Sequence, residues 1–209
     1  MPVKLVKRDQ ANNQENVVQD NEGQWLVQAQ KGDPQAFAYI VEKYQRPVYN
    51  MCYRMLGNAQ DAEDAAQETF LRTYKAMRRY DKDRSFSSWI LSIAAHYCID
   101  QIRRRRFTTI SVEELPVPDL PDISPGMENK LSKMEEQLRI RTLLEILDPT
   151  DRAAVVLYYW YDYSYKEICE TLSLSLSAVK SRLHRSRRAM ALCWIERQPA
   201  TVNAERIPA

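Results

Sequence analysis

The basic side chains of this sequence gather where they could contact nucleic acid. No Asp or Glu occurs between Thr171 and Ile195, a stretch that carries the basic residues Lys180, Arg182, His184, Arg185, Arg187 and Arg188. At helical spacing, one face near the start of this stretch presents Lys180, Ser181, His184 and Arg185. Arg can bind guanine through two hydrogen bonds, and Ser can bind a base or a phosphate. The pattern favours a recognition helix in the major groove over an ordinary solvated basic helix.

A second basic cluster is the run of four arginines from Arg103 to Arg106. The dipole of a helix explains one or two basic residues at its C-terminal end, whereas four in a row are typical of contact with a polyanion. Aromatic residues lie upstream, at Phe86, Trp89 and Tyr97. Basic residues beside aromatic rings suit single-stranded DNA, which needs phosphate neutralisation and base stacking. For Trp89 a place in the core is the favoured alternative, because apolar residues flank it.

An acidic stretch has the features of a surface that binds another protein. Asp61, Glu63, Asp64 and Glu68 lie in a segment without Lys or Arg from Met55 to Leu71. Asp61, Asp64 and Glu68 share a helix face, and Gln67 adds to its polarity. Favourable charge at a helix N-terminus explains Asp61 but not Glu68. A metal site is a poor interpretation, because these carboxylates have neither a His partner nor a ligand loop.

Few residues offer enzymatic chemistry. The only histidines, His96 and His184, both fall in the segments expected to face DNA. The four cysteines, Cys52, Cys98, Cys169 and Cys193, are dispersed without a CxxC pair and predict buried free thiols. We therefore expect no catalytic residue, no metal and no cofactor, because a nucleophile–base or metal–carboxylate constellation is missing.

Helices must position these side chains in the first half of the chain. A break at Gly32–Pro34 precedes an apolar stripe that runs at helical spacing to Gly57, a suitable C-terminal cap. Pro47 lies inside this stripe and predicts a kink or a restart. Further helices are expected over about 59–79 and about 87–106.

The second half predicts helices with clear N-terminal caps. A helix from about Leu131 to Leu147 is followed by Asp148 as N-cap with Pro149 at the first helical position. Ser164 to Glu167 reads as a capping box that opens a short helix. A further helix starts after Ser175 or Ser177 and continues to about Trp194. A short helix, a tight turn and a longer helix form a helix-turn-helix pattern.

Length and composition fit an all-α protein of two small helical domains. The 209 residues include only 4 glycines, which argues against Rossmann and P-loop folds. Residues 108–128 are acidic and contain four prolines, so they predict a linker that could reach roughly 70 Å. We expect a flexible tail at 1–21, domains at 22–107 and 129–196, and a second tail at 197–209. No apolar run reaches the roughly 20 residues that span a bilayer, so a cytoplasmic location without membrane insertion is expected.

Four segments together resemble the extracytoplasmic-function (ECF) group of sigma-70 RNA polymerase sigma factors. Residues 61–70 resemble the DAEDxxQExF helix of sigma domain 2, and residues 86–106 resemble its FxxWLxxIAxNxxxDxxRRxxR segment. Residues 151–159 resemble the start of sigma domain 4, and residues 165–185 resemble its helix-turn-helix. All four occur in order, with the linker between them.

The resemblance implies a transcription initiation factor that binds core RNA polymerase through its β′ and β subunits. By position, the β′ contact would involve Asp61, Asp64, Gln67 and Glu68. The promoter −10 element would be read as single strands, with the 81–87 loop and the side chains of His96, Tyr97, Asp100, Arg103, Arg104, Arg105 and Arg106 as candidates. The −35 duplex would meet Lys180, Ser181, His184 and Arg185, with Arg182 and Arg187 on the DNA backbone. A stress or envelope-response regulon and an anti-sigma partner are further expectations.

The sequence departs from the family pattern at two positions. His96 stands where many members carry Asn, which predicts an altered −10 preference. Ser173 stands where many carry Gly before the helix-turn-helix turn, and Ser tolerates the left-handed conformation less well.

The alternative function is that of a helix-turn-helix regulator that binds duplex operator DNA without polymerase. It explains residues 164–188, but neither the acidic helix nor the arginine run.

Overall fold

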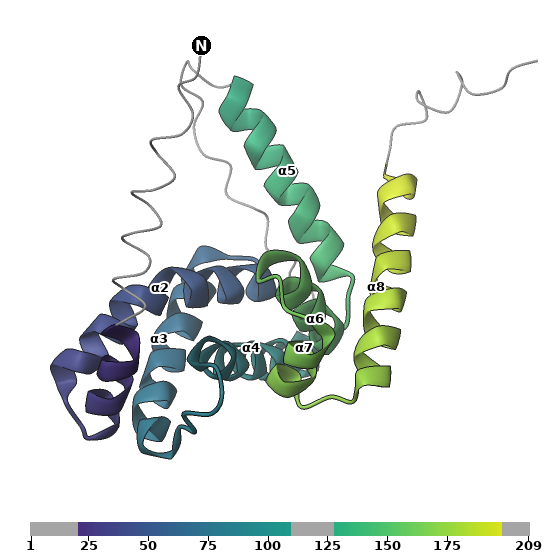
Figure 1. The fold of residues 1–209 in the computed structure, drawn as a ribbon. Coiled ribbons are helices and arrows are strands. Elements are labelled where there is room, and N and C mark those ends of the chain that lie inside the picture. Colours follow the sequence, from purple (N-terminus) through teal and green to yellow (C-terminus); the bar gives the residue numbers. More distant parts are fainter. Residues whose placement is uncertain (1–20, 110–127, 198–209) are drawn as a thin grey trace, which may run out of the picture.

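The computed structural model describes residues 21–109 and 128–197, and every regular element within them is helical. The chain is therefore all-α, as the sequence predicts (Figure 1). After a helix over residues 21–30 come, in order, α2 (Pro34–Leu56), α3 (Ala59–Ala76), a 3-10 turn (Met77–Arg79), α4 (Phe86–Thr109), α5 (Glu128–Glu145), α6 (Pro149–Trp160), α7 (Tyr165–Leu172) and α8 (Leu176–Glu196). Most of the expected linker and both expected tails lie outside the described residues.

The N-terminal bundle consists of α2, α3 and α4, which pack around a common core. Asp33 and Asn58 cap the starts of α2 and α3 with their side chains. Gly57 ends α2 in the left-handed conformation, with φ of 83°, as predicted for a C-terminal cap. The expected restart at Pro47 is wrong, because α2 continues through this residue as one helix.

The cysteines confirm the prediction of free thiols but only partly that of burial. Cys52 and Cys98 are buried in the N-terminal bundle, whereas Cys169 and Cys193 are partly exposed. A hydrogen bond with the Cys52 thiol, together with burial, raises the pKa of Cys98 well above its usual range. The Cys98 thiol is therefore held in the protonated form that suits an apolar core.

The C-terminal bundle consists of α5 to α8, and its predicted caps are confirmed. Asp148 caps α6 with Pro149 in the first turn, and Ser164 and Glu167 form both bonds of a capping box. Ser175, rather than Ser177, caps α8. The turn between α7 and α8 places Ser173 in the left-handed conformation, with φ of 54°. The helix-turn-helix thus keeps the backbone that Gly would adopt more easily.

The two bundles pack against each other mainly through α6 and α7 on one side and α4 and α2 on the other. Every residue of α6 from Pro149 to Leu157 is buried, so this helix has neighbours on opposite faces. Polar bonds cross the interface: Arg152 donates to the carbonyl of Met55, and the Tyr161 hydroxyl donates to the carbonyl of Pro47 at 2.6 Å. The second bundle therefore rests on specific groups of the first.

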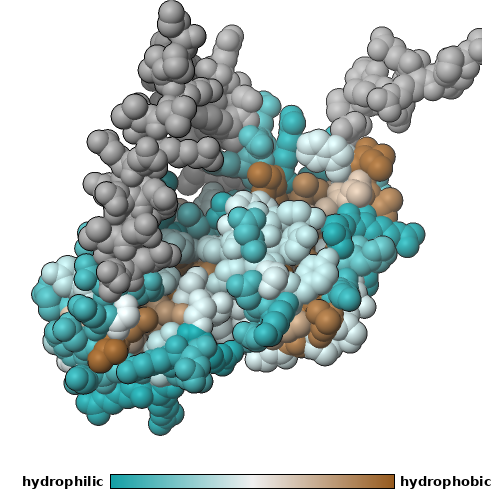
Figure 2. Space-filling view, in the orientation of Figure 1, coloured by the Kyte–Doolittle hydropathy of each residue, from teal (hydrophilic) through white to brown (hydrophobic). Residues whose placement is uncertain are grey.

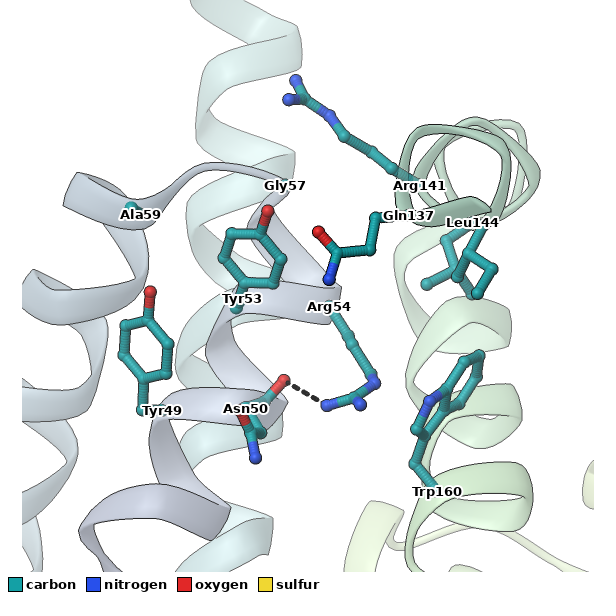
Figure 3. Close-up of a pocket in the computed structure, with 11 residues that line it drawn as sticks. Tyr49, Asn50, Tyr53, Arg54, Gly57, Ala59, Gln137, Arg141, Leu144 and Trp160 are labelled. Atoms are coloured by element: carbon teal, nitrogen blue, oxygen red, sulfur yellow. Dashed lines mark hydrogen bonds between the residues drawn. The ribbon is translucent and has the colours of Figure 1, made fainter. Parts of the chain in front are cut away.

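The interface also encloses a hollow, shown in Figure 3. A cavity of about 420 Å³ lies between α2 and the helices α5 and α6. Tyr53 and Arg54 line one side, Arg141 and Trp160 line the other, and the Arg54 guanidinium lies 5.0 Å from the centre of the Trp160 ring. Interfaces between domains are commonly more polar and less completely packed than a domain core, and this contact has that character.

The exposed surface is polar over most of the face in Figure 2, with an apolar area where α8 ends. Leu192, Trp194 and Ile195 are all exposed on this last part of α8. Within residues 21–109 and 128–197, no helix combines the length and the hydropathy needed to cross a membrane.

Candidate polymerase and nucleic-acid interfaces

The acidic residues predicted to bind a protein lie along α3. Asp64 and Gln67 are exposed, whereas Asp61 and Glu68 are partly buried. The backbone N–H of Asp61 donates to Oδ1 of the N-cap residue Asn58 at 2.7 Å. The four predicted residues therefore lie on one helix, and Asp64 and Gln67 are the two that are open to solvent.

A groove of about 500 Å³ runs beside this acidic face, between α2 and α3. Gln67 and Phe70 of α3 line it together with Val41, Arg46 and Tyr49 of α2. The α2 residues were not predicted as site residues, because their apolar spacing indicates only the core. An apolar stripe that is wider than one face of a helix is the sequence signal that could have indicated a second exposed apolar surface on α2.

Asp61 is held by an arginine from the end of α4. Both carboxylate oxygens of Asp61 accept from the guanidinium of Arg105, and one also accepts from the Asn58 side chain. The bond from Arg105, aided by Asn58 and opposed by burial, lowers the pKa of Asp61. The same bond raises the pKa of Arg105. A side chain predicted to bind protein is thus paired with one predicted to bind DNA.

The residues predicted to read single-stranded DNA follow α4. His96 is exposed, and its Nδ1 lies 2.7 Å from the carbonyl oxygen of Ser92. Tyr97 is partly buried beneath the guanidinium of Arg72, which lies 4.7 Å from the ring centre. Asp100 is exposed. These side chains occupy neighbouring turns of the helix, as the sequence spacing indicates.

The arginine run at the end of α4 divides between several partners. Arg103 donates to the hydroxyl of Thr150 in the C-terminal bundle at 3.2 Å, and Arg105 binds Asp61. Arg103, Arg104 and Arg105 are exposed, but a phosphate that binds Arg105 would have to share or displace Asp61. The side chain of Arg106 lies outside the described residues.

Trp89 belongs to an aromatic cluster beneath the start of α4. Its ring centre lies 5.5 Å from that of Phe86 and 4.9 Å from that of Tyr80. Trp89 is only partly buried, but it packs against the hydrophobic core. The favoured core interpretation of this residue is confirmed in part, because Trp89 packs against the core without being fully buried.

The helix α8 presents most of its predicted DNA contacts to solvent. Lys180, Ser181, His184, Arg185 and Arg187 are exposed. Arg182 is the exception, because its side chain retains 28% of its exposure and forms an ion pair with Asp151. The structure therefore brings the first turns of α8 together as one basic face, with Arg182 turned toward α6.

Asp151, in the first turn of α6, was not predicted as a site residue. Its side chain is 12% exposed, and its second oxygen lies 3.5 Å from Nη2 of Arg185. One carboxylate thus contacts two arginines of the predicted recognition helix. Its position in the first turn of α6 gives no signal of this contact, because acidic residues are common at helix N-termini.

Comparison with known proteins places both bundles in one family. The model of Sigma-70 region 2 matches residues 40–108, and the model of Sigma-70, region 4 matches residues 137–190. The chain is 36% identical to the ECF RNA polymerase sigma factor SigW of Bacillus subtilis over 173 residues, which cover 79% of the chain and 92% of that relative. It is 35% identical to the ECF RNA polymerase sigma factor SigE of Mycolicibacterium smegmatis, over 72% of the chain and 58% of that relative.

Solved structures show the same fold. CnrH in complex with the cytosolic domain of CnrY aligns with a TM-score of 0.63 at 23% identity, covering 83% of the chain and 97% of that structure. RpoE from Bartonella quintana, solved with the anti-sigma factor NepR, aligns with a TM-score of 0.57 at 16% identity over 78% of the chain and 98% of that structure.

Proposed function

The chain belongs to the extracytoplasmic-function sigma factors of the sigma-70 family, and from that premise we propose how its helices divide the work of transcription initiation. A sigma factor binds core RNA polymerase and directs it to promoters. It acts as an initiation factor, and we assign it no catalytic residue of its own. Its site of action is then the cytoplasm, where polymerase works.

The acidic face of α3 is the proposed contact with the β′ subunit of polymerase. The exposure of Asp64 and Gln67 supports this, since both can meet a partner without rearrangement. The neighbouring groove, with Phe70 and Tyr49 in its walls, adds apolar area to the acidic face. In the C-terminal bundle, the apolar end of α8 is the surface that we assign to the β subunit.

The helix α4 is the proposed reader of the −10 element as single-stranded DNA. Holding an extruded base costs a few kcal/mol of stacking and pairing energy. Exposed His96 and partly exposed Tyr97 can hydrogen-bond and stack with such a base, while Arg103 and Arg104 neutralise nearby phosphates. We expect His96 to shift the base preference from that of family members with Asn.

The helix α8 is the proposed reader of the −35 element as duplex DNA. Its cap at Ser175 fixes where the helix begins, so that Lys180, Ser181 and His184 fall on the exposed face of the first turns. Arg185 and Arg187 can reach phosphates from the same side. Arg182 would contact the DNA backbone only by sharing or leaving Asp151.

The observation that carries this proposal is that three charged surfaces lie on separate helices within the two matched family regions. The test is transcription by bacterial core polymerase from a promoter upstream of the chain's own gene. We expect transcripts only when the protein is added, and their loss on Asp64→Arg or Lys180→Glu. Two exposed positions away from the proposed surfaces, Glu136→Arg and Lys31→Glu, serve as charge-reversal controls.

A silent assay has two readings, which one further measurement separates. If the protein co-elutes with core polymerase, the promoter is wrong and the assignment of α3 stands. If the protein does not bind polymerase but binds duplex DNA by itself in a gel-shift assay, the helix-turn-helix regulator becomes the better assignment of function. The family comparisons do not favour that regulator.

An anti-sigma partner is also part of the proposal. The solved relative RpoE was captured with an anti-sigma factor. We expect a comparable protein to co-purify with this chain from its host and to prevent its binding to core polymerase. Co-purification of polymerase alone would contradict this expectation.

A further inference from the structure

Two side-chain contacts join the acidic face of α3 to the DNA face of α4. Asp61 binds Arg105 through both carboxylate oxygens. Glu68 accepts from Nε of Arg72 at 2.7 Å, and the guanidinium of Arg72 covers the ring of Tyr97. Asp61, assigned to the polymerase contact, therefore binds Arg105, which is assigned to the −10 strand. Glu68, also assigned to polymerase, binds the arginine that covers Tyr97.

The contact between Asp61 and Arg105 is the better formed of the two. Two parallel bonds between a guanidinium and a carboxylate give a strong and directional ion pair. The side chain of Asp61 is 23% exposed, which limits screening by solvent, whereas Arg105 retains 51%. The lowered pKa of Asp61 and the raised pKa of Arg105 agree with this geometry.

The pair occupies the groups that each side chain would offer to a partner. Arg105 directs Nη1 and Nη2 at Asp61, and these nitrogens form one of the edges through which a guanidinium binds a phosphate. Asp61 directs both oxygens at Arg105, and these are its only acceptors for a basic group of polymerase. Either external contact therefore competes with the internal one.

We propose that Asp61 masks Arg105 in the free chain, and that core polymerase releases Arg105 to the −10 strand by binding Asp61. The inference rests on the proposed assignments of α3 and α4. Because binding free energies are linked, the coupling is reciprocal: a bound −10 strand that takes Arg105 also frees Asp61 for polymerase.

The first test measures DNA binding by the free chain. Fluorescence anisotropy follows a labelled single-stranded oligonucleotide that carries the −10 sequence of a promoter transcribed by this protein. We expect Asp61→Asn to bind about five-fold more tightly than its control, the gain from releasing one ion pair near the upper end for exposed pairs. The control is Asp64→Asn, which removes the same charge one turn along α3.

Asp64 is a matched control because its contact within the described residues is local. Its Oδ1 lies 3.5 Å from the side-chain amide of Gln60 on the same helix. Both variants change the net charge equally, so long-range attraction to DNA rises equally in both. Only the Asp61 variant removes the charged carboxylate that the guanidinium of Arg105 binds. Circular dichroism and thermal melting establish that both variants are folded.

The outcomes separate three explanations. Tighter binding by Asp61→Asn than by Asp64→Asn supports masking. Equal binding by the two variants means that only net charge matters and overturns the proposal. Weaker binding by Asp61→Asn also overturns it, and would make Asp61 a residue that positions Arg105 for DNA.

The second test adds saturating core polymerase to the same oligonucleotide. We expect the difference between wild type and Asp61→Asn to disappear, because polymerase already holds Asp61 in the wild-type complex. A persisting five-fold difference would contradict the release step. If wild-type protein with polymerase neither binds the strand nor transcribes, the proposed function fails; if it does both while the two variants behave alike, only the masking fails.

Discussion

In both bundles an aspartate pairs with arginine on the helix that we propose to face DNA, but Asp61 and Asp151 differ in their surroundings. Asp61 of α3 holds Arg105 of α4 near the surface, with its side chain 23% exposed. Asp151 of α6 holds Arg182 and contacts Arg185 of α8, with its side chain 12% exposed. The same chemical pairing thus occurs once at a surface and once within the packing of a bundle.

The difference indicates two uses of one kind of ion pair. A pair near solvent costs little to break, so Arg105 can be exchanged between Asp61 and a phosphate. A pair that is largely buried costs much more to break, since the remaining charge loses its partner without regaining full hydration. We therefore expect Asp151 to help fix the orientation of α8, and Asp61 to hold Arg105 exchangeably.

The largest expected effect comes from breaking the inner pair. Asp151→Asn should lower the free energy of unfolding by about 2 kcal/mol, less than the roughly 3–5 kcal/mol for a fully buried pair, because Arg182 keeps 28% exposure. Asp61→Asn should cost about 1 kcal/mol or less. Urea titration of both variants measures the two values side by side.

This prediction also bears on DNA recognition by the second bundle. Asp151→Asn should weaken binding of a −35 duplex by the holoenzyme, since Arg182 and Arg185 lose their common anchor. Equal stability costs for the two variants would remove the distinction between an exchangeable and a fixed pair. Tighter duplex binding would show that Asp151 masks its arginines as well.

A smaller effect concerns acid stability and compares one carboxylate from each bundle. Arg105 lowers the pKa of Asp61, and bonds from Ser164 lower the pKa of Glu167 in the capping box of α7. A carboxyl whose pKa is lower in the folded state stabilises the fold above its unfolded pKa, about 4. That contribution is lost as the pH falls through the folded value.

The measurement is the free energy of unfolding between about pH 6 and pH 2.5. We expect Asp61→Asn to flatten the decline below about pH 4, by up to about 1 kcal/mol. Glu167→Gln should flatten it less, because Glu167 is exposed whereas Asp61 is partly buried. A wild-type slope in Asp61→Asn would mean that the ion pair adds nothing to stability in solution.

Local signals in the sequence predicted most of the fold. Short sequence patterns predict the caps at Asp148, Ser164 and Gly57, because the hydrogen bonds of a cap join residues that are close in the sequence. All three caps are present in the structure. The restart predicted at Pro47 is wrong, because the packing of α2 against α3 and α4 outweighs the loss of one helical hydrogen bond.

The candidate site was predictable where it depends on spacing along one helix, and not where it depends on contacts between helices. Asp64 and Gln67, or Lys180 and His184, share faces that the helical period fixes. The pairs that join Asp61 to Arg105 and Asp151 to Arg182 span 44 and 31 residues. No local pattern specifies such a separation, because it depends on how the helices pack.

The smallest expected effect compares the left-handed residues that end α2 and α7. Gly57 adopts this conformation without a side-chain clash, whereas Ser173 adopts it at φ of 54° with a Cβ atom. Left-handed backbone costs a non-glycine residue about 1–2 kcal/mol, and Gly loses about 0.5–1 kcal/mol more entropy on folding. Ser173→Gly should therefore stabilise the protein by about 0.5 kcal/mol.

Thermal melting of Ser173→Gly beside Ser177→Gly measures this effect against a matched change. Ser177 lies in the first turn of α8 with ordinary helical backbone, so Gly there should destabilise by about 0.5–1 kcal/mol. Opposite signs for the two variants would show that the turn of the helix-turn-helix stores backbone strain at Ser173. Destabilisation by both variants would mean that the Ser173 side chain stabilises the turn by more than its left-handed backbone costs. The turn at Ser173 would then share the backbone geometry of the Gly57 cap but not its energetics.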